Sequence, residues 1–164
     1  PGSISPQPAC SFPTVEELKS DGQLALLGFG QGKLTDTPVH FASVVAAISN
    51  GGYYNSTTLN IKNSSSNQVI SSKTCAVLRN YMKNVVENGT GFNAQYKSQT
   101  AGKTATAQSG IYVDGKEQLN TWFVGFYPYD NPKYSIVVMR EGGKSGAGDC
   151  CPVFRTIVEK IDNM

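Results

Sequence analysis

A nine-residue run of small side chains, Thr100–Gln108, constrains the fold more than any other part of the 164 residues. Gly, Ala and Thr fill the run except for Lys103 and the final Gln108. Thr favours strands, and small residues leave a strand's backbone open to a molecule lying alongside it. The run therefore predicts a strand over about Gln99–Gln108, on which Lys103 and Thr104 can grip a carboxylate.

Two other interpretations of this run compete with a binding strand. An ordinary edge strand with an exposed lysine is one. The other is a phosphate-binding P-loop, because Gly102-Lys103-Thr104 matches the end of that motif. A P-loop needs a glycine five residues before Gly102, where Lys97 stands, and a helix directly afterwards. The P-loop is therefore rejected.

Capping residues and hydrophobic spacing predict the helices. Thr37 is a good N-cap with Pro38 at the first helical position, and apolar residues then recur on one face. Similar patterns predict helices from Ser72 to Asn88 and from Pro152 onward. Residues 1–27 are expected to form an irregular lead-in with one short helix, from Val15 to about Lys19.

The strands are predicted from β-rich runs and turn residues. Trp122–Tyr127 and Tyr134–Arg140 are two such runs joined by a Pro-rich loop, and Asp114-Gly115 marks a turn before them. Residues 53–71 are expected to form short strands and a surface loop. The order helix, helix, three antiparallel strands, helix predicts an α+β fold, an antiparallel sheet with helices packed on it.

Length and charge restrict the class of protein. The chain is long enough for one domain or part of one. A net charge of +2 is too small to indicate nucleic acid as a partner. The longest apolar stretches, residues 24–30 and 39–48, are shorter than the roughly 20 residues that span a bilayer.

The nine-residue run is similar to the third motif, Lys-Thr-Gly, of penicillin-binding proteins and serine β-lactamases. The whole chain resembles the end of a class B penicillin-binding protein transpeptidase domain. Motifs in that family's order carry the resemblance: Gly30-Gln31-Gly32, Thr37-Pro38, Asn50-Gly51-Gly52, Glu87-Asn88-Gly89-Thr90-Gly91, Trp122-Phe123-Val124-Gly125 and Cys151-Pro152-Val153-Phe154. It implies a serine β-lactamase/transpeptidase-like fold, with residues 1–164 as the C-terminal portion of one domain and 28–164 as its motif-bearing part.

The resemblance also implies roles for the motif residues. The strand would be an edge strand with which the substrate pairs as an added strand. Lys103 and Thr104 would bind the carboxylate of a D-alanyl-D-alanine stem peptide or of a β-lactam, and the Thr106 N–H would be one of two oxyanion donors. Ala105 stands where the family usually has Gly, and its methyl group is expected to shift β-lactam acceptance modestly. No cofactor or metal is expected.

The nucleophile of this family is absent from the chain. The family attacks with the serine of Ser-x-x-Lys and relays the proton through Ser-x-Asn. No lysine of the 164 residues has a serine three positions before it. Ser65-Ser66-Asn67 matches the second pattern, but it follows Gly30-Gln31-Gly32, whereas the family places that motif earlier. Activity is therefore expected only of a larger protein that supplies the serine.

The implied reaction is acyl transfer. A serine attacks the D-Ala-D-Ala peptide bond, releases D-alanine and passes the acyl group to an amine of a neighbouring stem, so that peptidoglycan is cross-linked. The implied location is the outer face of the bacterial cytoplasmic membrane, with the anchor elsewhere in the protein. The alternative is a non-catalytic module that binds peptidoglycan or a cell-wall protein. A β-lactamase is disfavoured because the flanking motifs resemble transpeptidases.

An isolated portion of this fold is expected to leave a sheet edge and an apolar face uncovered. Its partners would then be the missing N-terminal part of the same domain, or a second copy in a homodimer.

His40 is the only histidine, and a structural role is expected for it. Cys75, Cys150 and Cys151 could join it as zinc ligands, since zinc prefers thiolate and imidazole. Their spacing fits no standard zinc pattern, and small buried cysteines are the preferred interpretation.

Overall fold

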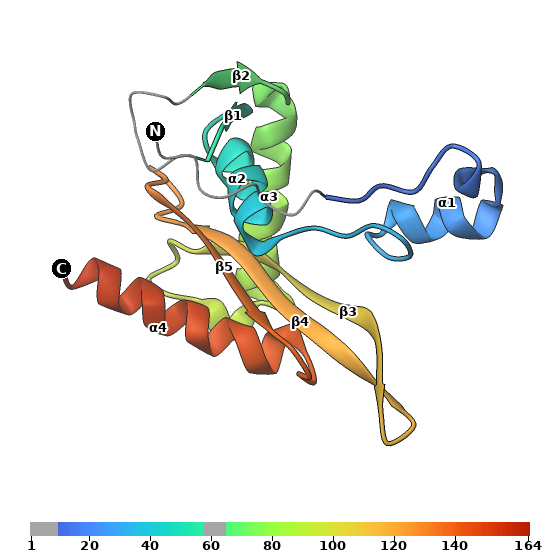
Figure 1. Cartoon of the computed structure of the whole chain (residues 1–164). Helices are drawn as coiled ribbons and strands as arrows, with labels where there is room; N and C mark the ends of the chain where they lie inside the picture. The colour runs from blue at the N-terminus through green and yellow to red at the C-terminus, as the bar shows by residue number, and fades with distance from the viewer. Residues whose placement is uncertain (1–9, 58–64) are drawn as a thin grey trace, which may run out of the picture.

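A three-stranded antiparallel sheet of order β3-β4-β5 lies between helices in the computed structural model, which describes residues 10–57 and 65–164 (Figure 1). Helices α2 and α3 lie on one side of this sheet and α4 on the other. The elements, in chain order, are η1 (Glu17–Lys19), α1 (Asp21–Gly28), α2 (Pro38–Ser49), β1 (Tyr53–Asn55), β2 (Ser66–Gln68), α3 (Ser72–Asn88), η3 (Phe92–Ala94), β3 (Ala101–Val113), β4 (Lys116–Tyr127), β5 (Tyr134–Arg140), η4 (Gly146–Cys150) and α4 (Cys151–Asp162). The α+β prediction is confirmed.

Alternation along β4 separates the two faces of the sheet, because successive strand side chains point to opposite sides. Phe123 faces α4, where its ring packs edge-on against Phe154 with centroids 4.7 Å apart. Trp122 faces α2 and packs against Phe41 at 5.6 Å. Phe123 and Phe154 are fully buried, whereas Trp122 is partly exposed.

The predicted helices over α2, α3 and α4 are confirmed, and α2 and α3 have side-chain N-caps. The Thr37 hydroxyl accepts the N–H of His40 and Pro38 opens α2, as the sequence predicts. Helix α3 is likewise capped by the Ser71 hydroxyl, which accepts the N–H of Thr74. The Asp114-Gly115 turn is also confirmed, and it joins β3 to β4 in a hairpin whose end projects from the body (Figure 1).

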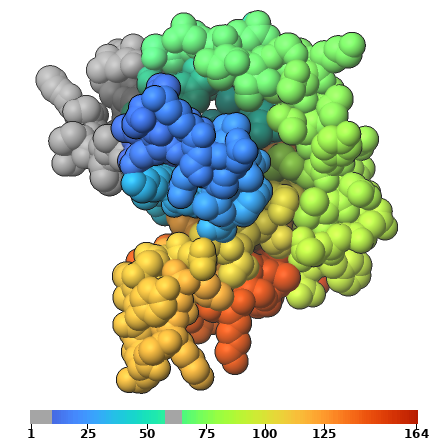
Figure 2. Space-filling model, turned by 90° about the vertical axis from the view of Figure 1, so that its right-hand side faces the viewer, coloured from blue at the N-terminus to red at the C-terminus, as the bar shows by residue number. Residues whose placement is uncertain are grey.

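The lead-in differs from its prediction. The sequence predicts one short helix within residues 1–27, whereas the structure adds α1 directly after η1. The apolar residues of α1 are consecutive, Leu24–Leu27, so they form no one-sided stripe that would predict a helix. Figure 1 shows η1 and α1 extending away from the body of the molecule, and Figure 2, viewed from that side, shows this part (blue) in front of the rest.

A second, two-stranded sheet pairs β1 with β2. The short strands expected within 53–71 are thus present, while the expected surface loop falls partly on residues 58–64, outside the described residues. Ser65-Ser66-Asn67, which matched Ser-x-Asn, belongs to this small sheet: Asn67 pairs with Tyr54. Among the helices of the described residues, none has the length and apolar character needed to cross a membrane.

Candidate functional site

The outer edge of β3 is the centre of the candidate site. In the described sheet β3 pairs with β4 alone, so its other edge has no strand partner. The side-chain amide of Gln31 donates to the carbonyl oxygen of Thr106 at 3.4 Å. A residue in an antiparallel strand directs its N–H and C=O to the same side, so the Thr106 N–H also faces the outer edge.

Lys103 brings its charge to the same edge. Its side chain is exposed, and its Nζ donates to the carbonyl oxygen of Thr104, 2.7 Å away. Thr104 lies two residues before Thr106, so its carbonyl points to the same side of the strand. An ammonium and an outward backbone N–H thus lie along one open strand edge, which suits an extended anionic ligand.

Thr104 projects its side chain to the opposite face from Lys103. Its hydroxyl forms a 2.6 Å hydrogen bond with the hydroxyl of Thr90, in the segment that follows α3. This contact links the motif strand to the Glu87–Gly91 motif. In this structure the Thr104 hydroxyl therefore already has a partner, which can donate to it or accept from it.

Ala105 lies beside Lys103 on the α2 face of the sheet. Both line a cavity of about 340 Å³, whose walls come from the segment between α1 and α2, from α2 and from the sheet. The residues around it are Gly30, Leu34, Thr35, Asp36, Phe41, Lys103, Ala105, Ala107, Gln108, Ser109, Asn120, Trp122 and Val124. The methyl group of Ala105 is thus part of a cavity wall, where a change in its size alters the space beside Lys103.

The segment around Gly146, between β5 and α4, packs closely against the motif strand on the α4 side of the sheet. A Cβ atom on Gly146 would lie 2.3 Å from the carbonyl oxygen of Trp122 and 2.8 Å from that of Ala105. The loop is kept in place by the Asp149 carboxylate, which accepts the backbone N–H groups of Lys144 (2.6 Å) and Ser145 (2.9 Å). These backbone hydrogen bonds, chiefly that of Ser145, hold the pKa of Asp149 below its usual range.

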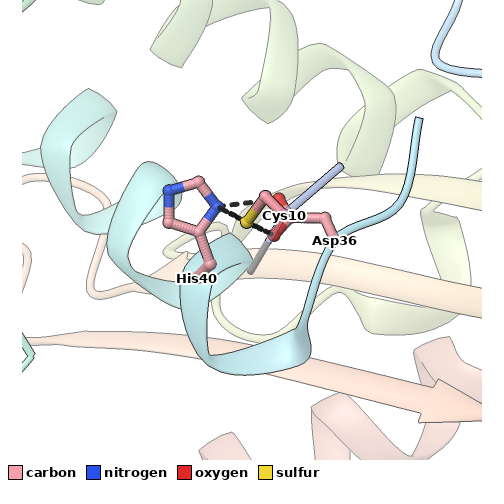
Figure 3. Close-up of side chains that lie close together, drawn as sticks. All are labelled: Cys10, Asp36 and His40. Atoms are coloured by element: carbon pink, nitrogen blue, oxygen red, sulfur yellow. Dashed lines mark hydrogen bonds and ion pairs between the residues drawn. The ribbon is translucent and has the colours of Figure 1, made fainter. Parts of the chain in front are cut away.

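The positions of His40 and the cysteines exclude one alternative considered from the sequence, a zinc site formed by His40 with Cys75, Cys150 and Cys151. Cys75 packs under α2, and Cys150 and Cys151 lie in the core between the sheet and α4, so these three do not join His40 in a zinc site. All four cysteines are free thiols. Instead, His40 lies with Cys10 and Asp36 (Figure 3).

Several contacts of the site escaped prediction from the sequence. Gln31 and Thr90 both belong to motifs that the sequence singled out, but nothing in their spacing shows that they touch β3. Cys10 carries no local signal at all.

Comparison with known proteins gives a consistent result. The family model described as "Penicillin binding protein transpeptidase domain" matches residues 9–159. The chain is 32% identical over 157 residues to the peptidoglycan D,D-transpeptidase FtsI of Buchnera aphidicola, covering 87% of this chain and 27% of that protein. It is also 32% identical over 142 residues to penicillin-binding protein 3 of Bacillus subtilis, covering 81% of this chain and 21% of that one.

A solved structure agrees with these relatives. The D,D-transpeptidase domain of a peptidoglycan glycosyltransferase from Eggerthella lenta superposes with a TM-score of 0.73 at 25% identity, over 96% of this chain and 43% of that one. The chain thus spans about a quarter of the length of the two curated relatives, 27% and 21%.

Proposed function

The chain belongs to the family of penicillin binding protein transpeptidase domains, and we propose that its β3 edge binds the stem peptide in a peptidoglycan D,D-transpeptidase. The reaction would be the family's acyl transfer through a serine, with β-lactams acylating the same serine. No Ser-x-x-Lys occurs in the 164 residues, so the nucleophile would come from another part of the same domain. The family resemblance carried by the order of motifs is confirmed, and so is the α+β fold predicted from the order of helices and strands.

The observation that carries the proposal is the set of groups along the β3 edge. An added strand needs outward N–H and C=O groups, which Thr104 and Thr106 provide. A terminal carboxylate needs a cation, and the Lys103 ammonium lies at that edge. The Thr106 N–H would be one oxyanion donor, a contribution that is typically worth about 3 kcal/mol in acyl transfer.

Two finer roles belong to the same proposal. The Thr104 hydroxyl would bind the substrate carboxylate after exchanging or sharing its bond with Thr90. The Ala105 methyl group would restrict the cleft relative to glycine, because it occupies a cavity wall beside Lys103.

The surroundings of the β3 edge support a partner from the same domain. Ile111, Tyr112 and Val113, at the end of β3, are 50–66% exposed although they are apolar. Exposed apolar clusters are typical of interfaces. The remaining part of the domain would cover these three exposed residues in the full protein and leave the edge at Thr104 and Thr106 open to the stem peptide. The full protein would lie on the outer face of the cytoplasmic membrane. Without that part of the domain, a second copy of the chain would cover the same exposed residues. Analytical ultracentrifugation over a range of concentrations would detect this as a dimer.

Labelling with a fluorescent penicillin tests the proposed function. This chain and a version extended upstream in its gene are labelled in parallel, and intact mass reports the acyl adduct. We expect label on the longer chain alone. Label on this chain by itself would reveal a different nucleophile, and label on neither would favour the non-catalytic module that binds peptidoglycan or a cell-wall protein.

A further inference from the structure

Three side chains of different chemistry meet where the lead-in crosses the start of α2. Cys10 Sγ lies 2.7 Å from Asp36 Oδ1 and 3.2 Å from His40 Nδ1. His40 Nδ1 lies 2.8 Å from Oδ1 and 2.9 Å from Oδ2 of Asp36. A thiol, a carboxylate and an imidazole thus direct one donor atom each toward a common point (Figure 3).

Backbone structure holds each of the three in place. Ser11 and Thr35 form an antiparallel bridge with reciprocal hydrogen bonds of 3.1 and 3.0 Å, which sets Cys10 beside Asp36. The Asp36 carboxylate accepts the N–H of Thr37 at 2.7 Å. His40 lies in the first turn of α2, with its ring edge-on to Tyr54. Such preorganisation is what a metal site requires of its ligands.

We propose that Cys10, Asp36 and His40 form a binding site for a zinc-type divalent metal ion, with water in the fourth position. Thiolate, imidazole and carboxylate are the ligands zinc prefers, at about 2.3, 2.0 and 2.0 Å. Tetrahedral bonds of those lengths separate the donor atoms by roughly 3.3–3.6 Å. The observed separations are shorter by less than about 1 Å, so a small outward movement of the side chains would admit the ion.

The arrangement fits a metal better than a catalytic triad. In a triad the nucleophile and the carboxylate contact opposite ring nitrogens of the histidine. Here Sγ of Cys10 and both oxygens of Asp36 approach the same atom, Nδ1 of His40. Convergence on one side of the ring is the geometry of a shared ion.

The site would fix one wall of the cavity next to the motif strand. Asp36 lines the same cavity as Lys103. Cys10 comes from the lead-in and His40 from α2, so a bound ion would join these two segments. The role is structural, and it does not depend on the transpeptidase reaction.

Cobalt substitution tests the site. The reduced, metal-free protein is titrated with Co²⁺, whose thiolate charge-transfer absorption reports a bond to cysteine sulfur. We expect one equivalent to bind, Zn²⁺ to displace it, and Cys10→Ser to abolish the charge-transfer band. Asp36→Asn and His40→Gln should each weaken the affinity for Co²⁺ at least about 100-fold. This is more than the 10- to 100-fold loss typical of residues that only hydrogen-bond to the ligands.

Cys75→Ala is the matched control, since it removes a thiol outside the cluster and should keep the band. Circular dichroism verifies that each variant is folded. The absence of a band at one equivalent in the wild type would overturn the proposal. So would a band that survives in folded Cys10→Ser, or unchanged affinity in both Asp36→Asn and His40→Gln.

Discussion

The side-chain amide of Gln31 occupies the hydrogen-bonding position on the Thr106 carbonyl that an N–H of an added strand would use. A ligand strand at this edge must therefore share the carbonyl with Gln31 or displace it. The Gly30-Gln31-Gly32 motif thus reaches the motif strand directly.

Replacing Gln31 by leucine should free this acceptor. In the complete domain we expect Gln31→Leu to raise the second-order acylation rate by a β-lactam about two- to fivefold, the value of one hydrogen bond of about 1 kcal/mol or less. Stopped-flow acylation measures it. A slower reaction would show instead that the Gln31 amide holds the strand in its reactive position.

Removing the charge of Lys103 should weaken carboxylate binding. A charge-assisted hydrogen bond contributes about 1.5–3 kcal/mol, so Lys103→Ala in the complete domain should lower acylation roughly 10- to 100-fold. Lys116→Ala, at the exposed start of β4, removes the same charge away from the cavity and should leave the rate unchanged. Equal acylation rates in the two variants would show that Lys103 does not contribute to carboxylate binding.

Ala105→Gly should change β-lactam preference more than stability. The methyl group lines the cavity beside Lys103, and its loss widens the space there. We expect acylation rates in the complete domain to shift by a few fold and by different factors for β-lactams of different size. Rates that are unchanged across a panel would show that position 105 does not restrict the cleft.

Gly102 is needed for packing against the sheet core. A Cβ atom there would lie 2.3 Å from Cζ of Phe123 and 2.7 Å from the Val124 carbonyl oxygen. Gly102→Ala should therefore lower the free energy of unfolding by about 1–3 kcal/mol or more. Gly28→Ala, with nothing within 4 Å of its Cβ position, is the control and should destabilise little or not at all in urea denaturation.

Asp162 should make stability depend on acid pH. The Lys97 ammonium donates to its carboxylate at 2.7 Å and the Tyr127 hydroxyl donates as well, so the pKa of Asp162 is lowered to about 2. An unfolded Asp titrates near 3.9. The folded state therefore gains from the charged form above about pH 4 and loses this gain as the pH falls through about 2.

Urea denaturation of wild type and Asp162→Asn between pH 6 and 2.5 measures this effect. The stability difference should be largest at pH 6 and shrink toward pH 2.5. Asp114→Asn, in the hairpin turn at φ 51°, is the control, because Asp and Asn both tolerate that conformation. A difference independent of pH would contradict the assigned role of Asp162.

The sequence predicts elements whose signals are local. Thr37-Pro38 defines the start of α2 by a cap and a fixed φ angle, and the Asp114-Gly115 turn defines the hairpin. Strand β3 runs five residues beyond its predicted end at Gln108, across a register shift between Gln108 and Tyr112. Ser109 and Gly110 interrupt the β pattern there, so the extension depends on pairing with β4 rather than on propensity.

The site was predictable only as far as its strand. Lys103 and Thr106 belong to one contiguous motif, and the alternation of side chains and backbone groups along a strand predicts which way each one points. The cluster of Cys10, Asp36 and His40 depends on the bridge between Ser11 and Thr35, a long-range pairing with no local signal. Asp36 and His40 lie 26 and 30 positions after Cys10, so sequence spacing alone does not identify them as its neighbours.

The buried thiols allow local opening of this fold to be measured through their rates of alkylation. Cys75, Cys150 and Cys151 are at most 1% exposed, and burial raises the pKa of Cys151 to about 12. An alkylating reagent can reach them only when a layer separates, because the reactive thiolate is suppressed inside. Cys75 lies between α2 and α3 and the other two between the sheet and α4, so their alkylation rates would time the loosening of each layer independently.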